Sequence, residues 1–301
     1  MELSLKDIKN VLILGCGNLG TRVGLRFALS GYRVKMYDID EKAFVAARTN
    51  MQQLLQHLIK KKLLDPELKD EIVGRISWTT SPEEAVIGAD LINESVTEEV
   101  DIKLKVWEQF GALSPVHTIF TTNTSYLLPS MFADACGRPE RFCAYHFHDV
   151  FFANVVDVMP HARTEKWVIT LLMELGPVLE QIPVFVEKES PGYIFNHMLM
   201  SVLGSAGALL TKGTGSVEAI DKSWMGNMKT EIGPFGILDA IGLDTAWHVV
   251  KNYEDSKSKR FAALLKQMID NNQLGVKSGQ GFYSYPNPKF RDPEFLGEKR
   301  G

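Results

Sequence analysis

The sequence predicts an α/β fold, with a doubly wound parallel sheet over residues 1–187 followed by an all-helical domain over residues 188–301. Two observations support this division. Short apolar stretches alternate with amphipathic segments through the first half, which is typical of parallel strands joined by crossover helices. After Ser190-Pro191 the chain has helical spacing almost throughout, with breaks at 213–215, 233–234 and around 251–259.

A glycine-rich turn follows the first predicted strand. The apolar run at 11–14 leads into three glycines at GxGxxG spacing. Alone, such a match is as often an ordinary loop as a phosphate-binding turn. Here an amphipathic segment follows at 21–30, and a second strand at 33–38 ends in an acid about 20 residues beyond the glycines, where an acid accepts from the adenosine ribose. This context predicts a Rossmann-type domain that binds NAD through Gly15, Gly17, Asn18, Leu19, Gly20 and Asp38.

The other elements of the first part follow in order. Helices are predicted over 41–64, from Pro66, from Pro82, and over 98–110 and 164–181; strands are predicted over 75–79, 90–96, 118–122, 142–148, 155–158 and 183–186. Ser81 supplies a helix cap before Pro82. The lysines at 60–62 close the long helix, and we interpret them as a solvated helix end, with contact to a polyanionic ligand tail as the alternative.

Composition and charge exclude several other classes of protein. A hydrophobic content of 45% and a charged content of 23% are ordinary for a globular chain, and the net charge of -4 offers no basic surface for nucleic acid. No apolar run approaches the ~20 residues that cross a bilayer, and residues 1–10 do not resemble a signal peptide. We therefore expect a cytoplasmic protein without a membrane partner. Cys16, Cys136 and Cys143 lack metal-ligand spacing, so reduced thiols and no metal site are expected.

Four polar residues fall at strand ends or helix starts near the edge where ligands bind. They are Ser125, His146, Asp157 and Asn196. A histidine is the natural general base near neutral pH, a carboxylate can orient it, and a hydroxyl with an amide can bind a developing carbonyl oxygen. Each also has an ordinary structural explanation, such as a helix cap or a satisfied buried histidine. Spacing alone does not choose between these.

The chain resembles the 3-hydroxyacyl-CoA dehydrogenase family over nearly all of its length. The resemblance rests on the glycine turn with Asp38 and on later motifs in the right order. These motifs are Asn123-Thr124-Ser125, Pro139 to Phe147, Ser190-Pro191-Gly192-Tyr193-Ile194-Phe195-Asn196, Gly233-Pro234-Phe235-Gly236, Ile241-Gly242-Leu243-Asp244 and Gly279-Gln280-Gly281-Phe282-Tyr283. Several separate motifs in sequence are far more specific than any one of them.

The resemblance implies reversible oxidation of an (S)-3-hydroxyacyl-CoA, such as 3-hydroxybutyryl-CoA, by NAD, as in fatty-acid β-oxidation. It also implies a Rossmann-type domain followed by a helical domain that supplies a homodimer interface. In this chain His146 would be the general base, and Ser125 and Asn196 would hold the 3-oxygen of the substrate. By the same resemblance Glu98, Lys103 and Asn123 would lie near the cofactor.

The chain departs from the family pattern around the histidine. Family members usually read His-Phe-Phe-Asn-Pro, whereas His146-Phe147 is followed here by His148, Asp149 and Val150. The family glutamate that pairs with the histidine is replaced by Asp157, one position early and one methylene shorter. Either a one-residue deletion brings Asp157 into the same place, or the histidine has another partner, for which Asp149 is the other candidate. His148 is then a second polar group at the substrate or a half-exposed structural histidine, and Asp149 adds a negative charge near cofactor or substrate.

Two alternative functions fit the same motifs. One is a dehydrogenase of a small free 3-hydroxy acid, similar to the related L-gulonate and carnitine enzymes. The other is a non-catalytic NAD-binding protein of the crystallin kind. The retained Ser125, His146 and Asn196 argue against the second alternative.

The acid at the end of the second strand predicts the cofactor preference. The Asp38 carboxylate would repel the 2′-phosphate of NADP, so kcat/KM for NAD should exceed that for NADP by at least about tenfold, which corresponds to ~1.4 kcal/mol. Initial rates with each cofactor measure this ratio, and Asp38→Asn should reduce it. Equal efficiency with the two cofactors would contradict the prediction.

Overall fold

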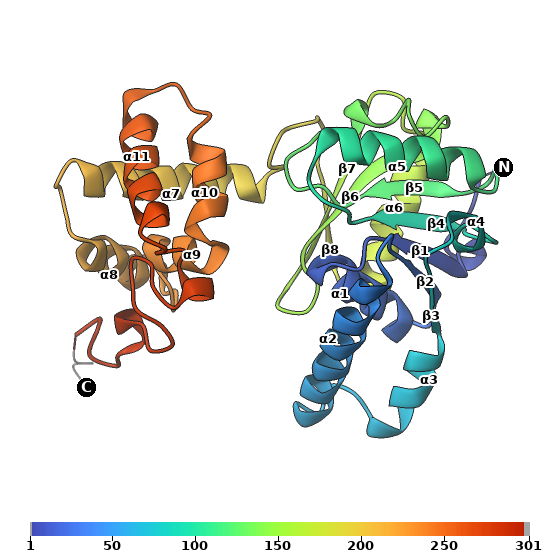
Figure 1. Ribbon diagram of the computed structural model, residues 1–301, viewed down its shortest axis with the longest axis horizontal. Helices are drawn as coiled ribbons and strands as arrows, with labels where there is room; N and C mark the ends of the chain where they lie inside the picture. The colour runs from blue at the N-terminus through green and yellow to red at the C-terminus, as the bar shows by residue number, and fades with distance from the viewer. Residues whose placement is uncertain (1, 298–301) are drawn as a thin grey trace. The chain divides into compact units, whose positions relative to one another are not determined.

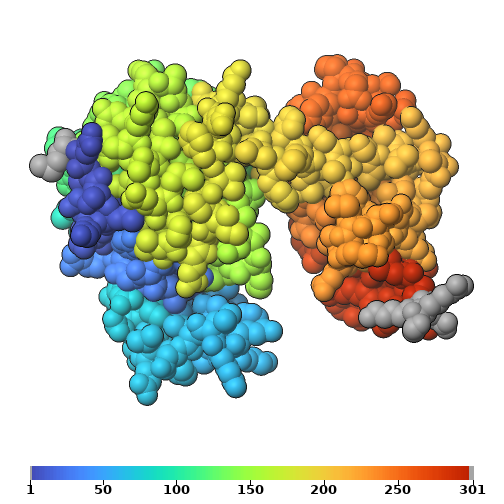
Figure 2. Space-filling model, turned by 180° about the vertical axis from the view of Figure 1, so that it is seen from behind, coloured from blue at the N-terminus to red at the C-terminus, as the bar shows by residue number. Residues whose placement is uncertain are grey.

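The computed structural model describes residues 2–297 and divides into two compact units between Ile194 and Phe195. The division predicted from the sequence lies at 187/188, seven residues earlier. Figure 1 draws the elements of each unit, and Figure 2 shows the same units as space-filling surfaces, the first coloured from blue to yellow and the second from yellow to red. Among the described residues no helix combines the length and the apolar character needed to cross a membrane.

One sheet of eight strands organises the described part of the first unit, in the order β3-β2-β1-β4-β5-β6-β7-β8. The strands are β1 (Asn10–Leu14), β2 (Arg33–Tyr37), β3 (Ile76–Thr79), β4 (Leu91–Glu94), β5 (Ile119–Thr122), β6 (Phe142–Asp149), β7 (Ala153–Pro160) and β8 (Ile182–Phe185). Strands β1 to β6 pair in parallel, β7 is antiparallel to β6, and β8 is parallel to β7. The order 3-2-1-4-5-6 is that of a doubly wound dinucleotide-binding sheet, so the predicted fold class is confirmed.

Helices cover both faces of this sheet. They are α1 (Asn18–Leu29), α2 (Glu41–Lys60), α3 (Lys69–Gly74), α4 (Pro82–Ala85), α5 (Val100–Leu113) and α6 (Lys166–Val178). One apolar core packs Val23 and Phe27 of α1 with residues of α2 and α6, and a second core on the other face packs Trp107 and Phe110 of α5. Figure 1 shows α1 and α5 on opposite sides of the strands. This arrangement leaves the carboxyl ends of β1, β4 and β5 free to form a ligand crevice.

Several element ends differ from their predicted positions, and backbone contacts explain the differences. Helix α2 ends at Lys60 rather than 64, because Lys62 adopts a left-handed conformation with φ of 58°. Helix α5 begins at Val100 rather than 98, because the Glu98 carboxylate binds a neighbouring loop. Ser81 caps α4 as predicted, accepting from the N–H of Glu84 at 3.2 Å.

The second unit is helical as predicted. Its helices are α7 (Phe195–Thr211), α8 (Val217–Met228), α9 (Pro234–Ile241), α10 (Leu243–Val250) and α11 (Ser256–Asp270). Leu203, Phe235, Leu238 and Phe261 are among the fully buried side chains of its core. The turn-rich strip at 275–285 packs against this core through Tyr283.

Two buried carboxylates attach that strip to the helices. Asp221 of α8 accepts from the N–H groups of Phe235 and Gly236 at 2.9 and 3.1 Å, and from the hydroxyl of Tyr283 at 3.0 Å. Asp239 of α9 accepts from the N–H of Tyr283 at 2.8 Å. Burial raises the pKa of both carboxyls above the usual value. Each hydrogen bond therefore replaces water that the carboxylate has lost.

Removing the Tyr283 hydroxyl should destabilise the second unit. Tyr283→Phe takes one donor from a buried carboxylate, which costs about 1–3 kcal/mol in the free energy of unfolding. Tyr253→Phe is the matched control, because this ring is 46% exposed and the change should stay within about 0.5 kcal/mol. Urea unfolding of the full chain, followed by circular dichroism, measures both. Equal unfolding midpoints for the two variants would count against this role.

Candidate active site

The glycine turn between β1 and α1 has the geometry of a pyrophosphate cradle. Gly15 has φ of 95°, and a Cβ there would lie 2.6 Å from the Ser95 carbonyl oxygen. A Cβ on Gly20 would lie 2.1 Å from the Gly15 carbonyl oxygen, whereas one on Gly17 would meet nothing within 4 Å. Gly15 and Gly20 therefore allow the close backbone approach, and Gly17 leaves open space at the N-terminus of α1. These residues fit a bound dinucleotide phosphate.

The acid after β2 is fixed against the same turn. Asp38 Oδ2 accepts from the Cys16 N–H at 2.8 Å, and Oδ1 accepts from the Asp40 N–H at 3.1 Å. The half-buried carboxylate thus lies beside the glycine turn, where the adenosine ribose is expected. Burial, with the charge of Asp38, raises the pKa of the Cys16 thiol to about 12, so Cys16 stays a neutral small side chain. All three cysteines are buried and free.

A buried ion pair occupies the carboxyl end of β4. Lys103 of α5 is 1% exposed, and its Nζ lies 2.5 Å from Glu94 Oε1 and 3.3 Å from Glu98 Oε2. Glu94 also accepts from the Val96 N–H at 2.8 Å and from the Thr122 hydroxyl at 2.7 Å. Charged groups this deep persist because they are paired and hydrogen-bonded. The pair fixes the start of α5, and proximity of Lys103 to the ribose stays a prediction.

Glu98 connects this ion pair to the loop after β5. Its Oε1 accepts from the Ser125 N–H at 2.9 Å and from the Thr124 hydroxyl. Partial burial opposes ionisation, but the Lys103 ammonium and these hydrogen bonds hold the pKa of Glu98 below its usual value. The amide of Asn123 donates to Ser95 at 3.0 Å and its oxygen accepts from the Phe147 N–H at 2.8 Å. Glu98 therefore holds the Ser125 backbone, and Asn123, two residues earlier, attaches the same loop to β6.

His146 and Asp157 face one another across two antiparallel strands. The register pairs His146 of β6 directly with Asp157 of β7, and His146 Nδ1 lies 3.1 Å from Asp157 Oδ2. His146 is 4% exposed and Asp157 1%. Because Thr122 of β5 pairs with Ala144, His146 lies two residues past the end of β5, level with Thr124. The structure thus brings His146, Asp157 and the Ser125 loop to one edge of the sheet.

Tyr193 covers the face of the His146 ring. The two rings stack with centroids 4.7 Å apart and planes inclined by 20°. The Tyr193 hydroxyl donates to the Thr124 carbonyl at 2.7 Å, which ties the stack to the same loop. Burial lowers the pKa of His146 below its usual value, while the Asp157 carboxylate acts in the opposite direction. In the neutral ring, a hydrogen bond from Nδ1–H to Asp157 leaves Nε2 to accept a proton.

The two family departures take different positions. His148 Nε2 lies 2.8 Å from Asp157 Oδ2, the oxygen that His146 also contacts. The three atoms lie within 4.8 Å of one another, and hydrogen bonds account for that spacing, so we assign the cluster to proton chemistry rather than to a metal. Asp149 pairs with Arg22 of α1 at 2.7 Å. Its negative charge is therefore balanced by a partner that the sequence did not indicate.

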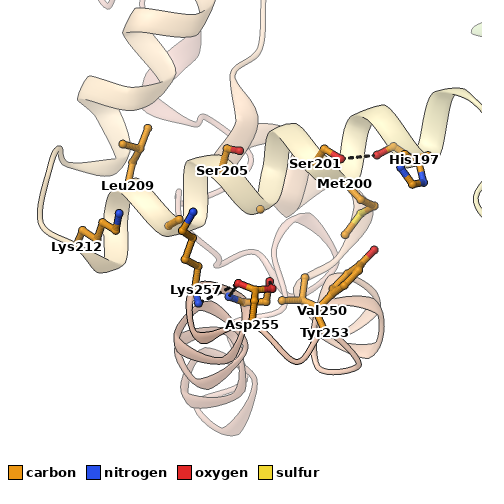
Figure 3. Close-up of a pocket in the computed structure, with 13 residues that line it drawn as sticks. His197, Met200, Ser201, Ser205, Leu209, Lys212, Val250, Tyr253, Asp255 and Lys257 are labelled. Atoms are coloured by element: carbon orange, nitrogen blue, oxygen red, sulfur yellow. Dashed lines mark hydrogen bonds between the residues drawn. The ribbon is translucent and has the colours of Figure 1, made fainter.

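Asn196 belongs to the second unit, near the start of α7, so its contact with the substrate stays a prediction. That unit also contains a groove of about 540 Å³ between α7 and residues 250–258. Figure 3 shows His197 and Ser201 along α7, Lys212 just past its end, and Asp255 across the groove. The site residues predicted from the sequence do not line it.

Sequence reasoning missed two residues that shape the site. Glu94 stands at the end of an apolar strand, and an acid at that position was itself a signal of a buried partner. Tyr193 lies inside the motif at 190–196. Its ring reaches His146 only because residues 190–194 turn back, with φ of 55° at Tyr193. No periodicity in the sequence indicates such a turn.

A doubly wound sheet, a dinucleotide cradle and a buried histidine–carboxylate pair together define a nicotinamide-dependent dehydrogenase. Comparison with known families agrees. Residues 10–190 match the model of the 3-hydroxyacyl-CoA dehydrogenase NAD binding domain, and residues 192–285 match the C-terminal domain of the same enzymes. The chain belongs to the 3-hydroxyacyl-CoA dehydrogenase family, whose members are NAD-dependent oxidoreductases.

Individual relatives cover nearly the whole chain. A probable 3-hydroxybutyryl-CoA dehydrogenase of Bacillus subtilis is 30% identical, over 93% of this chain and 98% of its own length. The solved structure of (S)-3-hydroxybutyryl-CoA dehydrogenase from Ralstonia eutropha has a TM-score of 0.85 at 29% identity, covering 93% and 100%. A structure described as a diketoreductase acting on dicarbonyl compounds has a TM-score of 0.86 at 35% identity, covering 92% and 99%.

Replacing the carboxylate opposite His146 should slow the reaction. Asp157→Asn removes the charge that stabilises a protonated imidazole, so we expect kcat to fall at least tenfold, a loss of ~1.4 kcal/mol. The apparent pKa of His146 should fall further below its usual value, because the effect that opposes burial is gone. The pH dependence of kcat measures both effects.

Asp149→Asn is the matched control for this change. It alters a carboxylate three residues from His146 that pairs with Arg22 instead, so it should lower kcat less. A larger loss in Asp149→Asn, with Asp157→Asn near wild type, would contradict the pairing of His146 with Asp157.

Proposed function

We propose that this chain oxidises the 3-hydroxyl group of an (S)-3-hydroxyacyl-CoA to the 3-oxoacyl-CoA, with His146 as the general base. The observation that carries the proposal is the buried His146–Asp157 pair at the edge of the sheet where the Ser125 loop also ends. A general base contributes about 10²–10⁴-fold to rate when its basicity matches the working pH. The hydrogen bond from Nδ1 to Asp157 leaves His146 Nε2 as the atom that would take the proton.

The residues divide the work of the reaction. Gly15, Gly17, Gly20 and Asp38 would hold NAD, whose nicotinamide ring accepts the hydride from C3 when the cofactor is bound. His146 Nε2 takes the proton from the 3-hydroxyl, and the resulting imidazolium is stabilised through Nδ1–H by the Asp157 carboxylate.

Other residues of the chain hold both the Ser125 loop and the His146 ring in place. The Ser125 hydroxyl would bind the 3-oxygen as it becomes a carbonyl. The same role for Asn196 of the second unit rests on the family resemblance alone. Glu98 holds the Ser125 backbone, so the hydroxyl starts from an ordered loop. Tyr193 restricts the His146 ring to one plane. These contacts pre-organise the site, because they already exist within the chain before a substrate binds.

A second candidate is the reduction of a small substrate that carries no CoA. The 35% identical diketoreductase structure favours it. In this case the same His146 would donate a proton to a free carbonyl substrate.

We also propose that the protein is a cytoplasmic homodimer. Phe195, Met198 and Leu209 of α7 are 50%, 56% and 41% exposed, which is unusual for large apolar side chains on one helix. A second copy of this chain would cover them. This surface belongs to the unit that provides the dimer interface in the resemblance above.

The experiment that separates the candidates compares substrates with and without CoA. Acetoacetyl-CoA with NADH should give kcat/KM at least about tenfold above acetoacetate, 2,4-pentanedione or free 3-hydroxy acids with the matching cofactor, because binding of the CoA portion lowers the barrier for the reacting end. Cofactor absorbance at 340 nm measures every rate. A preference for the free compounds would favour the second candidate, and no turnover with any of them would reject both.

A further inference from the structure

Two histidines share one carboxylate oxygen in the first unit. Asp157 Oδ2 accepts from His146 Nδ1 at 3.1 Å and from His148 Nε2 at 2.8 Å, so the contact with His148 is the shorter. The Asp157 side chain is 2% exposed, that of His146 5% and that of His148 10%. The two imidazole rings lie with centroids 4.7 Å apart.

The local backbone places both rings on the same side of β6. Residues two apart in a strand share a face, so the side chains of His146 and His148 lie on the same face of β6. The pairing with β7 is regular at Phe147 and Val156, then shifts between Phe147 and Asp149. His148 stands at this irregularity, where a strand can re-aim a side chain. Asp157, in the middle of β7, is therefore within reach of both histidines.

A shared acceptor affects the proposed base. A carboxylate has several lone-pair positions and can accept both hydrogen bonds, but a donor at His148 withdraws negative charge from the oxygen that must stabilise a protonated His146. Because His146 and Asp157 are buried and the His148 side chain is only 10% exposed, solvent screens this competition weakly. The bond from His148 also fixes the Asp157 side chain, which would otherwise be held by His146 alone.

We propose that His148 is a positioning residue, which holds the Asp157 carboxylate and keeps the His146 imidazole in the neutral form that accepts a proton. The proposal rests on the proposed role of His146 as the base. His148 acts through Asp157 and needs no contact with substrate. This role accounts for a histidine at position 148, where the family resemblance leads one to expect phenylalanine.

The charged groups around His146 agree with this assignment. Asp157 of β7 and Glu98 before α5 favour the protonated ring, whereas burial and His148 of β6 disfavour it; Tyr193 covers the ring face with a neutral phenol. The net result is a pKa of His146 below its usual value. Removing His148 takes away one of the two effects that lower it.

The test compares His148→Phe, which restores the usual family residue and removes the donor, with His148→Gln, which keeps an N–H donor of similar reach. Both are made in the full chain with NAD bound. The long-range ¹H–¹⁵N spectrum of ring-labelled histidine gives the titration midpoint of His146, assigned by the signal missing in His146→Gln. The pH dependence of kcat/KM for acetoacetyl-CoA reduction is recorded alongside.

We expect His148→Phe to raise the His146 midpoint by about 0.5–1 pH unit, and His148→Gln to stay closer to wild type than to His148→Phe. His117→Gln, which changes a histidine–carboxylate pair with Asp90 before the first residues of β4 and β5, should leave the midpoint unchanged. An unchanged or lowered midpoint in His148→Phe would overturn the proposal, as would an equal shift in both variants. A midpoint in the wild type that moves on adding EDTA would overturn it too, because a cation would then hold the three side chains.

The two readouts separate this inference from the proposed function. The spectrum reports His146 whether or not the enzyme turns over a CoA substrate. A raised midpoint without such turnover supports the role of His148 and rejects the proposed substrate. Turnover with an unmoved midpoint supports the substrate and rejects the role of His148.

Discussion

The hydrogen-bond register between β6 and β7 is the constraint on which the proposed chemistry depends. The antiparallel ladder sets His146 opposite Asp157, and a slip of one residue would turn the carboxylate to the other face of the sheet. Aspartate is shorter than the glutamate usual in the family, yet the direct pairing brings its oxygen within 3.1 Å of the ring. Strand geometry thus compensates for the missing methylene.

A second constraint acts at the ends of β4 and β5. The buried contact of Lys103 with Glu94 and Glu98 fixes the beginning of α5, and Glu98 in turn fixes the Ser125 backbone. Such a network is costly to build, because each charge must be removed from water. The network holds the edge of the sheet where, in the proposed reaction, the substrate hydroxyl would contact Ser125.

Both units contain buried carboxylates, but the groups that pair with these carboxylates differ. In the first, buried carboxylates at the sheet edge are paired with a lysine or with histidines, whose protonation can change during a reaction. In the second, Asp221 and Asp239 accept from backbone N–H groups and tyrosine hydroxyls, which keep their protons at neutral pH. The first arrangement suits proton transfer, and the second suits only the attachment of one segment to another.

The sequence by itself determined the architecture and the family. Local patterns can be read directly along a sequence. Those used here are the glycine spacing, the acid at Asp38 and the alternation of strand and helix. The predicted fold class and the 3-hydroxyacyl-CoA dehydrogenase family were both confirmed. Helix ends were less accurate. Their positions depend on contacts with other segments, as Glu98 illustrates at the start of α5.

Only the tertiary structure decided how the departures around His146 are accommodated. From sequence, Asp149 and Asp157 were both candidates for its partner, and His148 had two interpretations. Pairing across strands joins residues eleven apart, and the salt bridge of Asp149 with Arg22 joins residues 127 apart. Spacing along a chain carries no information on such distances, because they are set by sheet register and by how α1 packs on the strands.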